Sequence, residues 1–230
     1  TPQEFNLFAD QAQMEIFEQY FYDLNQFMRT PGNNTGHSDM VTNLEEKISL
    51  FEKYAVNVRV SGGYGSVMTS EIVRLYRIEN VRVEYVSESY ISEAEEIQLN
   101  ELQKYFDSPL GAPSKRRPVY TRYKGGTNPQ ALKVYPSPES ATWANDNWVF
   151  TDRVLVSYIQ KPLNPNWAYV VINDKPLYNS TSSTDFELHP SEESELVYRI
   201  LVYAGIAIEK PQLAQTGAGL ISAQIQQEKQ

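Results

Sequence analysis

The stretch VSYIQKPLNPNW, residues 156–167, begins as a strand pattern and then meets two prolines in the spacing Pro-x-x-Pro behind a lysine. It can be interpreted as a recognition peptide, a hinge or a strand stop. A proline-rich ligand needs exposure and freedom, yet this segment continues directly from the alternating residues 154–159. Pro162 has no N–H for a sheet and restricts Lys161 to extended geometry. We therefore predict a strand stop, with Trp167 re-anchoring the chain.

Helical patterns lie at both ends of the chain. Thr1-Pro2-Gln3-Glu4 carries helix-start signals, and apolar residues then recur at helical spacing as far as Met28. A second helix is expected over residues 39–54, forming an αα-hairpin with the first. Near the other end, His189-Pro190 is expected to cap a helix that runs to Gly205, and Pro211 begins the last helix.

Between these helices the pattern changes to a period of two, which is typical of strands. Residues 72–78 and 81–86 predict a hairpin that turns at Glu79-Asn80, and residues 92–106 predict a short acidic helix. Further strands are expected at residues 119–123, 132–135, 148–150, 154–159, 168–172 and 176–178. Short strands at this spacing suggest an antiparallel sandwich or barrel.

The predicted fold class is therefore α+β. Residues 1–60 and 187–230, with the short helix 92–106, are assigned to a helical part, and residues 61–91 and 114–186 to a β part.

Composition narrows the function classes. The 230 residues contain 41% hydrophobic and 21% charged residues, which is typical of a folded protein. The net charge of −9 argues against a general nucleic-acid binder, and the absence of cysteine excludes disulfides and thiolate sites. No apolar run is long enough to span a bilayer and no leader pattern is present, so we expect no membrane association and synthesis in the cytoplasm. Sixteen tyrosines are a mild sign of assembly.

No motif predicts an enzyme, a cofactor site or a metal site. The glycine-rich segment 62–65 lacks the spacing of a phosphate loop. Glu93, Glu95, Glu96 and Glu101 are interpreted as the solvent face of the short helix, and His189 as a cap.

A basic segment follows an acidic one. Residues 108–138 contain no acidic residue, whereas residues 84–101 are strongly acidic. Three interpretations fit this separation of acidic from basic residues: a solvated loop, a nucleic-acid contact and a contact between subunits. In the subunit contact, the acidic patch of one copy meets the basic patch of the next. Gly217 and Gly219 would also let another backbone approach closely. The candidate interface residues are Lys115, Arg116, Arg117, Arg122, Lys124, Glu93, Glu95, Glu96, Gly217 and Gly219.

The order of four segments carries a resemblance: PVYTRY, ALKVYPSP, VLVSYIQKPLNPNW and DFELHPSEESELVYRILVYAGIAIEKPQLAQ. Over about residues 118–215 the chain resembles head-to-tail connector (ring or tail-tubular) proteins of crAss-like tailed bacteriophages. Tyr158, Lys161, Pro162 and residues 188–193 match the family pattern, whereas Gln160 stands where a basic residue is expected.

The resemblance implies a non-enzymatic subunit of the virion neck. Such proteins form rings, commonly of about twelve copies, that stack below the portal protein and contact other neck and tail rings. Genome DNA passes through without sequence-specific binding, and a negative chain suits that passage because phosphate does not adhere to it. Two alternatives stay open: another virion part such as a tail hub or baseplate component, and a carbohydrate- or peptide-binding β module that uses Trp143, Trp148 and Trp167.

Overall fold

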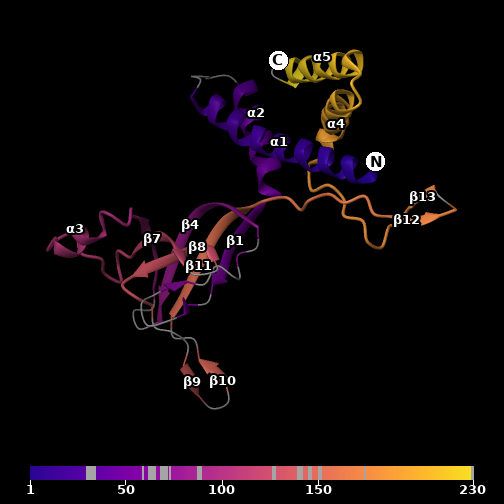
Figure 1. Ribbon diagram of the computed structural model, residues 1–230. Helices are drawn as coiled ribbons and strands as arrows, with labels where there is room; N and C mark the ends of the chain where they lie inside the picture. The colour runs from indigo at the N-terminus through magenta and orange to yellow at the C-terminus, as the bar shows by residue number, and fades with distance from the viewer. Residues whose placement is uncertain are drawn as a thin grey trace. The chain divides into compact units, whose positions relative to one another are not determined.

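The computed structural model describes residues 1–29, 35–58, 60–61, 66–67, 72, 74–86, 90–125, 128–138, 142–144, 147–149, 152–173 and 175–228 (Figure 1). The chain divides into two compact units. The helical unit comprises Thr1–Phe51 and Pro162–Gln230, and the β unit comprises Glu52–Lys161. Helices and largely antiparallel sheets together confirm the predicted α+β class.

Helices, a short 3-10 turn and a β-hairpin build the helical unit. Its elements are α1 (Pro2–Arg29), α2 (Thr35–Ser49), β12 (Tyr169–Ile172), β13 (Lys175–Tyr178), η3 (Pro190–Glu192), α4 (Glu193–Ala207) and α5 (Pro211–Glu228). The backbone N–H of Glu4 donates to the Thr1 hydroxyl at 3.4 Å, as the start signal of α1 predicts. Asn173, between the two hairpin strands, has a φ of 50°, a conformation that asparagine tolerates in turns.

The core of the helical unit lies along α1. Its buried positions recur at helical spacing: Ala9, Ala12, Gln13, Ile16, Phe17 and Tyr20. The ring of Phe17 meets that of Phe51 edge-on, with centroids 4.9 Å apart, just beyond the end of α2. Aromatic pairs in this geometry add to the free energy of burial, so the ring-rich stripe of α1 is covered by α2 and the residues that follow it.

Two sheets build the β unit, together with a short helix and a separate two-stranded pair. Its elements are β1 (Glu52–Val58), β2 (Val60–Ser61), β3 (Ser66–Val67), β4 (Leu75–Tyr85), β5 (Tyr90–Glu93), β6 (Glu95–Glu96), α3 (Leu102–Asp107), β7 (Val119–Gly125), β8 (Asn128–Tyr135), β9 (Thr142–Ala144), β10 (Asn147–Val149) and β11 (Asp152–Gln160). One sheet has the order β1-β11-β4-β5 and the other the order β2-β3-β8-β7-β6, while β9 pairs with β10. The neighbouring strands are antiparallel except β6 and β7, which run parallel.

Both sheets contribute to one hydrophobic core. Val83 on β4 and Val156 on β11 pack in the same buried cluster as Leu132 and Val134 on β8. Among the described strands the two sheets stay separate, so the arrangement is sandwich-like and no closed barrel forms. Packing of two sheets through their inner faces explains the period of two in this part of the sequence.

The predicted hairpin at Glu79-Asn80 is wrong, because β4 runs without interruption from Leu75 to Tyr85. Asn80 lies opposite Ser157 on β11 and Ile78 lies opposite Tyr158, so Glu79 is an extra residue in the ladder. A β-bulge of this kind lets a polar residue interrupt the alternation while the strand continues.

The predicted helix over residues 92–106 is also wrong. Residues 90–93 and 95–96 are strands, and only Leu102–Asp107 is helical. The backbone N–H of Ala94 donates to the Val81 carbonyl at 2.8 Å, and that of Glu95 donates to the Pro118 carbonyl at 3.0 Å. These hydrogen bonds to two different strands replace the helical ones, which shows tertiary pairing overriding the helix propensity of glutamate.

The unit boundaries differ from the expected ones. The second helix ends at Ser49, and β1 and the first residue of β2, which were expected in the helical part, belong to the β unit. Residues 162–186, expected in the β part, belong to the helical unit and include β12 and β13.

The stretch at residues 156–167 is a strand stop, as predicted. β11 ends at Gln160, and the N–H of Lys161 still donates to the Arg74 carbonyl at 2.7 Å. From Pro162 onward the chain belongs to the helical unit. There the N–H of Trp167 donates to Asn6 Oδ1 at 2.8 Å, and Gln13 Nε2 donates to the Leu163 carbonyl at 2.7 Å. Side chains of α1 thus anchor the segment after the strand, including the predicted anchor at Trp167.

Candidate functional site

The acidic and basic segments meet within one chain. β6 lies beside β7, with Glu95 in register with Val119 and Glu96 with Tyr120. Arg117 Nη2 donates to Glu95 Oε2 at 3.3 Å, and Arg122 Nε lies 2.8 Å from Glu96 Oε1. Strand pairing therefore brings together charges that are more than twenty positions apart in the sequence.

Tyr120 completes this charged edge. Its hydroxyl donates to Glu96 Oε2 at 2.9 Å, while its ring is buried in the shared core. Burial raises the pKa of Tyr120 to about 12, and the hydrogen bond and charge of Glu96 add to this effect, whereas Arg122 opposes it. The carboxylate of Glu96 is thus held by both a phenol and a guanidinium.

The other residues of the predicted acid–base interface have varied surroundings. Glu93 accepts a hydrogen bond from Asn80 Nδ2 at 3.0 Å, and the Lys115 ammonium lies 5.7 Å from the centre of the Tyr85 ring. Arg116 is exposed, and the side chain of Lys124 lies outside the described part of the structure. Because Glu95 and Glu96 already pair with arginines of their own chain, charge attraction between copies is not needed to explain them. Glu93, Glu95 and Glu96 lie on strands and Glu101 is the N-cap of α3, so the predicted acidic helix face does not form.

Gly217 and Gly219 have different environments. A Cβ at Gly217 would lie 2.7 Å from Val202 Cγ2 and 3.4 Å from the Tyr198 carbonyl oxygen, so α4 occupies the space that a side chain would take. Gly205 on α4 is equally tight, with the Ala214 nitrogen 2.8 Å from its added Cβ. Around Gly219 there is nothing within 4 Å. The close approach expected from the glycines is therefore the packing of α5 on α4 at Gly217, while Gly219 is open.

A polar network joins α1 to α4. Arg199 Nε donates to Glu195 Oε1 at 2.7 Å, and its Nη1 donates to Glu15 Oε2 at 3.0 Å. Tyr203 donates to the other oxygen of Glu15. Burial lowers the pKa of Arg199, but the hydrogen bonds and charges of Glu195 and Glu15 outweigh it and the net shift is upward. Burial, assisted by Glu15, raises the pKa of Tyr203 to about 12. The network therefore keeps an ion pair charged at the seam between the two helices.

Sequence reasoning missed this network and a second buried pair. The spacing of four between Glu195 and Arg199 is a helical ion-pair signal that could have located half of the first. Lys47 on α2 pairs with Glu192, whose side chain is 2% exposed. No local pattern indicates that second pair, because it joins residues from opposite ends of the chain.

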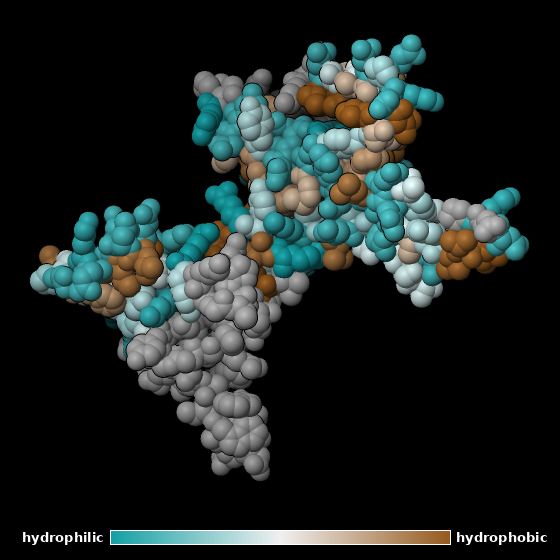
Figure 2. All heavy atoms as spheres, viewed as in Figure 1, coloured by the Kyte–Doolittle hydropathy of each residue, from teal (hydrophilic) through white to brown (hydrophobic). Residues whose placement is uncertain are grey.

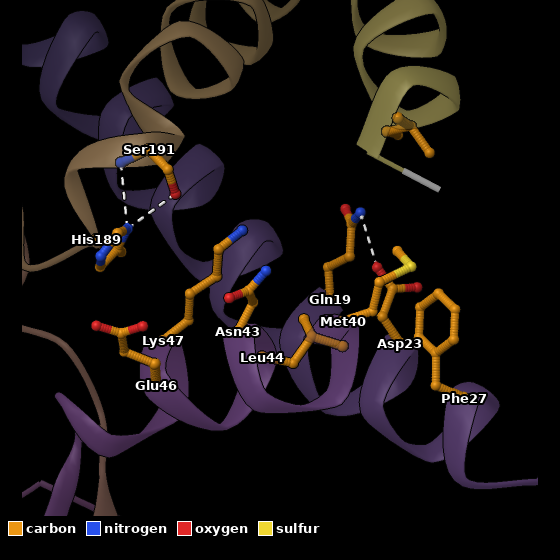
Figure 3. Close-up of a pocket in the computed structure, with 11 residues that line it drawn as sticks. Gln19, Asp23, Phe27, Met40, Asn43, Leu44, Glu46, Lys47, His189 and Ser191 are labelled. Atoms are coloured by element: carbon orange, nitrogen blue, oxygen red, sulfur yellow. Dashed lines mark hydrogen bonds between the residues drawn. The ribbon is translucent and has the colours of Figure 1, made fainter. Parts of the chain in front are cut away.

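A pocket of about 370 Å³ lies between α1, α2, η3 and α5 (Figure 3). Its lining is formed by Gln19, Asp23, Phe27, Met40, Asn43, Leu44, Glu46, Lys47, His189, Ser191 and Ile225. Figure 3 shows Ser191 turned back to the His189 ring and Gln19 bonded to Asp23. His189 Nδ1 accepts the Ser191 N–H at 3.3 Å and so caps η3, as predicted. These polar groups, together with the pair formed by Lys47 and Glu192, bind one another and hold the helix ends together. They do not point toward a common ligand position in the pocket.

Apolar residues remain uncovered on the β12–β13 hairpin. Val170, Val171, Ile172, Leu177 and Tyr178 are 48–59% exposed. The register places Val170 opposite Leu177, and Tyr169 opposite Tyr178, so apolar residues occupy both faces. The Trp167 ring stacks on Tyr169 at 5.8 Å between centroids, near the base of the hairpin. Figure 2 shows this apolar surface at β12–β13 and a second one over α4 and α5.

Three exposed apolar residues on and directly after α4 form a stripe, whereas Ile206 lies on another face of the helix. Val197 and Leu201 are one helical turn apart and share a face, and Ile208 continues the same face directly after the helix. α1 and α5 contact other faces of α4: Arg199 and Tyr203 reach α1, and Gly205 meets α5. We call Val197, Leu201 and Ile208 the α4 stripe. Its residues are 39–55% exposed, so the described part of the helical unit covers this apolar surface only in part.

None of the helices that the structure describes combines the length and apolarity needed to cross a bilayer. In the same described ranges, no group of three or more His, Asp or Glu side chains is arranged to hold a metal ion. No protein-family model matches the chain, and a search of curated proteins found no match.

Proposed function

We propose that this chain is a non-enzymatic structural subunit of a phage head-to-tail connector, which assembles into a ring that joins portal to tail and passes genome DNA. The virion neck is its site of action and the host cytoplasm its site of synthesis. The observation that carries the proposal is the uncovered apolar surface of the helical unit, on the β12–β13 hairpin and the α4 stripe. A monomer in water gains nothing from exposing such surface, whereas an assembly buries it.

Other features support the proposal. A helical unit and a β unit agree with the helical part and β part that the resemblance implies for such ring proteins. Among the residues that the structure describes, the polar networks joining α1 to α4 and Lys47 to Glu192 hold helices together. The net charge of −9 suits a channel that DNA crosses without adhering, because adhesion needs an excess of lysine and arginine.

The test is the mass and symmetry of the assembled protein. The purified full chain is studied alone and mixed with the portal protein of its phage, by native mass measurement and electron microscopy. The proposal expects closed rings, of about twelve copies, either from the chain alone or on the portal. A stable monomer that ignores the portal contradicts it. A ring with a basic lumen contradicts the argument from charge.

The alternatives give different results in the same experiments. A tail hub or baseplate component would assemble with a different copy number and would not bind the portal. A carbohydrate- or peptide-binding module would be a monomer with affinity for glycans or peptides. Residues 143 and 148 pair in register across β9 and β10, whereas Trp167 stacks on Tyr169 in the helical unit. Because residues 143 and 148 belong to the β unit, the three tryptophans do not share one compact unit.

A further inference from the structure

We propose that the β12–β13 hairpin of one copy seats on the α4 stripe of a second copy of this chain. The inference deepens the proposed ring, because it names the surfaces through which neighbouring subunits bind. Both surfaces are exposed on the described part of the helical unit, and each forms one half of this contact.

The hairpin needs a partner on physical grounds. An isolated two-stranded hairpin is marginal in water, because it has no third strand or helix to cover its apolar side chains. Val170, Ile172 and Leu177 share one face of this hairpin and are each about half exposed. Among the described elements, β12 and β13 pair only with each other. Seating that face on another apolar surface removes it from water and stabilises the hairpin.

The spacing of the apolar residues along the α4 stripe matches their spacing along β12. Val197 and Leu201 are separated by one turn, and Ile208 lies two turns further on. Four residues of α-helix rise about 6 Å, and two residues of a strand rise about 6.5 Å. Val170 and Ile172 are spaced in this way along β12, so both can contact the stripe at successive turns.

Charge favours a second copy as the occupant. Lys175 lies opposite Ile172 on the apolar face of the hairpin, and Glu193 lies at the start of α4, one turn before Val197. Both side chains are exposed, and neither forms an ion pair with another residue that the structure describes. A hairpin running along the stripe with its tip toward the start of α4 brings Lys175 to Glu193. One chain therefore carries both complementary surfaces.

The symmetry of such a contact fits the proposed ring. The hairpin and the stripe are different surfaces, so the contact is head-to-tail: each copy offers a hairpin to one neighbour and a stripe to the other. Contacts of this kind close into rings when the rotation between copies allows it, and otherwise continue as open chains.

Disulfide trapping tests the contact directly, because the chain contains no cysteine. Two single variants of the full chain, Ile172→Cys on the hairpin and Val197→Cys on α4, which this orientation places side by side, are mixed in equal amounts and mildly oxidised. We expect a cross-linked dimer on a non-reducing gel, and a ladder of multimers from the variant that carries both cysteines. Leu7→Cys is the matched control, because Leu7 is an exposed apolar residue on α1 outside the contact. Cross-linking no greater than that of Leu7→Cys mixed with Ile172→Cys overturns the proposal.

A charge exchange tests the orientation. Lys175→Glu places like charges together and is expected to raise the dissociation constant of self-association by roughly two- to fivefold, the range of an exposed ion pair. Combining it with Glu193→Lys is expected to restore the original value. Additive losses in the double variant overturn the pairing of Lys175 with Glu193.

The outcomes separate this contact from the proposed function. Rings on the portal without hairpin–stripe cross-links leave the connector function in place and overturn the contact. Cross-linked open chains that do not bind the portal leave the contact in place and contradict the connector.

Discussion

Three glycines on α4 and α5, two of them at the seam between these helices, provide a graded test of the helical packing. Alanine replaces each of Gly219, Gly217 and Gly205 in turn. Each position lies inside a helix, where alanine is more favourable than glycine by about 0.8–1.0 kcal/mol. The three substitutions thus share the same gain in helix propensity and differ in what the new methyl group contacts.

The structure gives the size of that difference. At Gly219 nothing lies within 4 Å of the added Cβ, so Gly219→Ala should stabilise the protein by close to the full gain. At Gly217 the Cβ lies 2.7 Å from Val202 Cγ2, whereas carbon atoms at rest lie about 3.5–4.0 Å apart. Relieving that overlap costs about 1–3 kcal/mol, which leaves Gly217→Ala between neutral and about 2 kcal/mol less stable than the natural chain. At Gly205 the contact is a backbone nitrogen at 2.8 Å, which cannot rotate away as a side chain can. Gly205→Ala should therefore lose the most stability of the three variants.

Urea unfolding followed by far-ultraviolet circular dichroism measures this order, because the signal reports the helices. Each kcal/mol corresponds to about 2–4 °C in thermal midpoint for a chain of this size. If Gly217→Ala and Gly205→Ala are as stable as Gly219→Ala, the packing of α5 on α4 is not as described. A Gly219→Ala variant that unfolds at a higher urea concentration, yet fails to assemble, would show that Gly219 contacts another copy, as the sequence suggested.

Two further predictions concern buried polar groups. Glu192→Ala leaves the Lys47 ammonium without its buried partner and should lower the free energy of unfolding by about 3–5 kcal/mol. The double variant Lys47→Met/Glu192→Leu should recover much of that loss in the same urea assay. If Glu192→Ala is as stable as the double variant, the reasoning is contradicted. The pKa of Tyr120 is raised from 10.0 to about 12, so the fold favours the neutral phenol. The resulting stability is present below pH 10 and lost as the pH rises toward 12. Tyr120→Phe should lessen that loss, and Glu96→Gln should lower the pKa in an absorbance titration, whereas an unchanged titration would refute the role of Glu96.

The helical ends of the fold were predictable because their signals are local. Capping at Thr1 and His189, the apolar stripe of α1 and the proline that begins α5 each act within a few residues. The strand stop after Gln160 was predictable for the same reason, since a proline lacks an N–H wherever it lies.

The errors arose where distant segments pair. Residues 92–95 alternate between buried and exposed, with Ser92 and Ala94 inside and Glu93 and Glu95 outside. That period of two was visible in the sequence, but the helix propensity of glutamate pointed the other way. Hydrogen bonds to Val81 and Pro118 settled the conformation, and those partners are known only from the sheets. The bulge at Glu79 has the same origin.

The sequence by itself determined the α+β class, the position of the long helices and the end of β11, because these follow from propensity, capping and proline geometry. It also separated acidic from basic residues and placed two glycines in the last helix. Only the tertiary structure decided what these features contact. Parallel pairing of β6 with β7 joined Glu95 and Glu96 to arginines of the same chain, and the approach of α4 engaged Gly217 but left Gly219 open. Long-range contacts depend on which faces meet across the chain, and local patterns do not encode that choice.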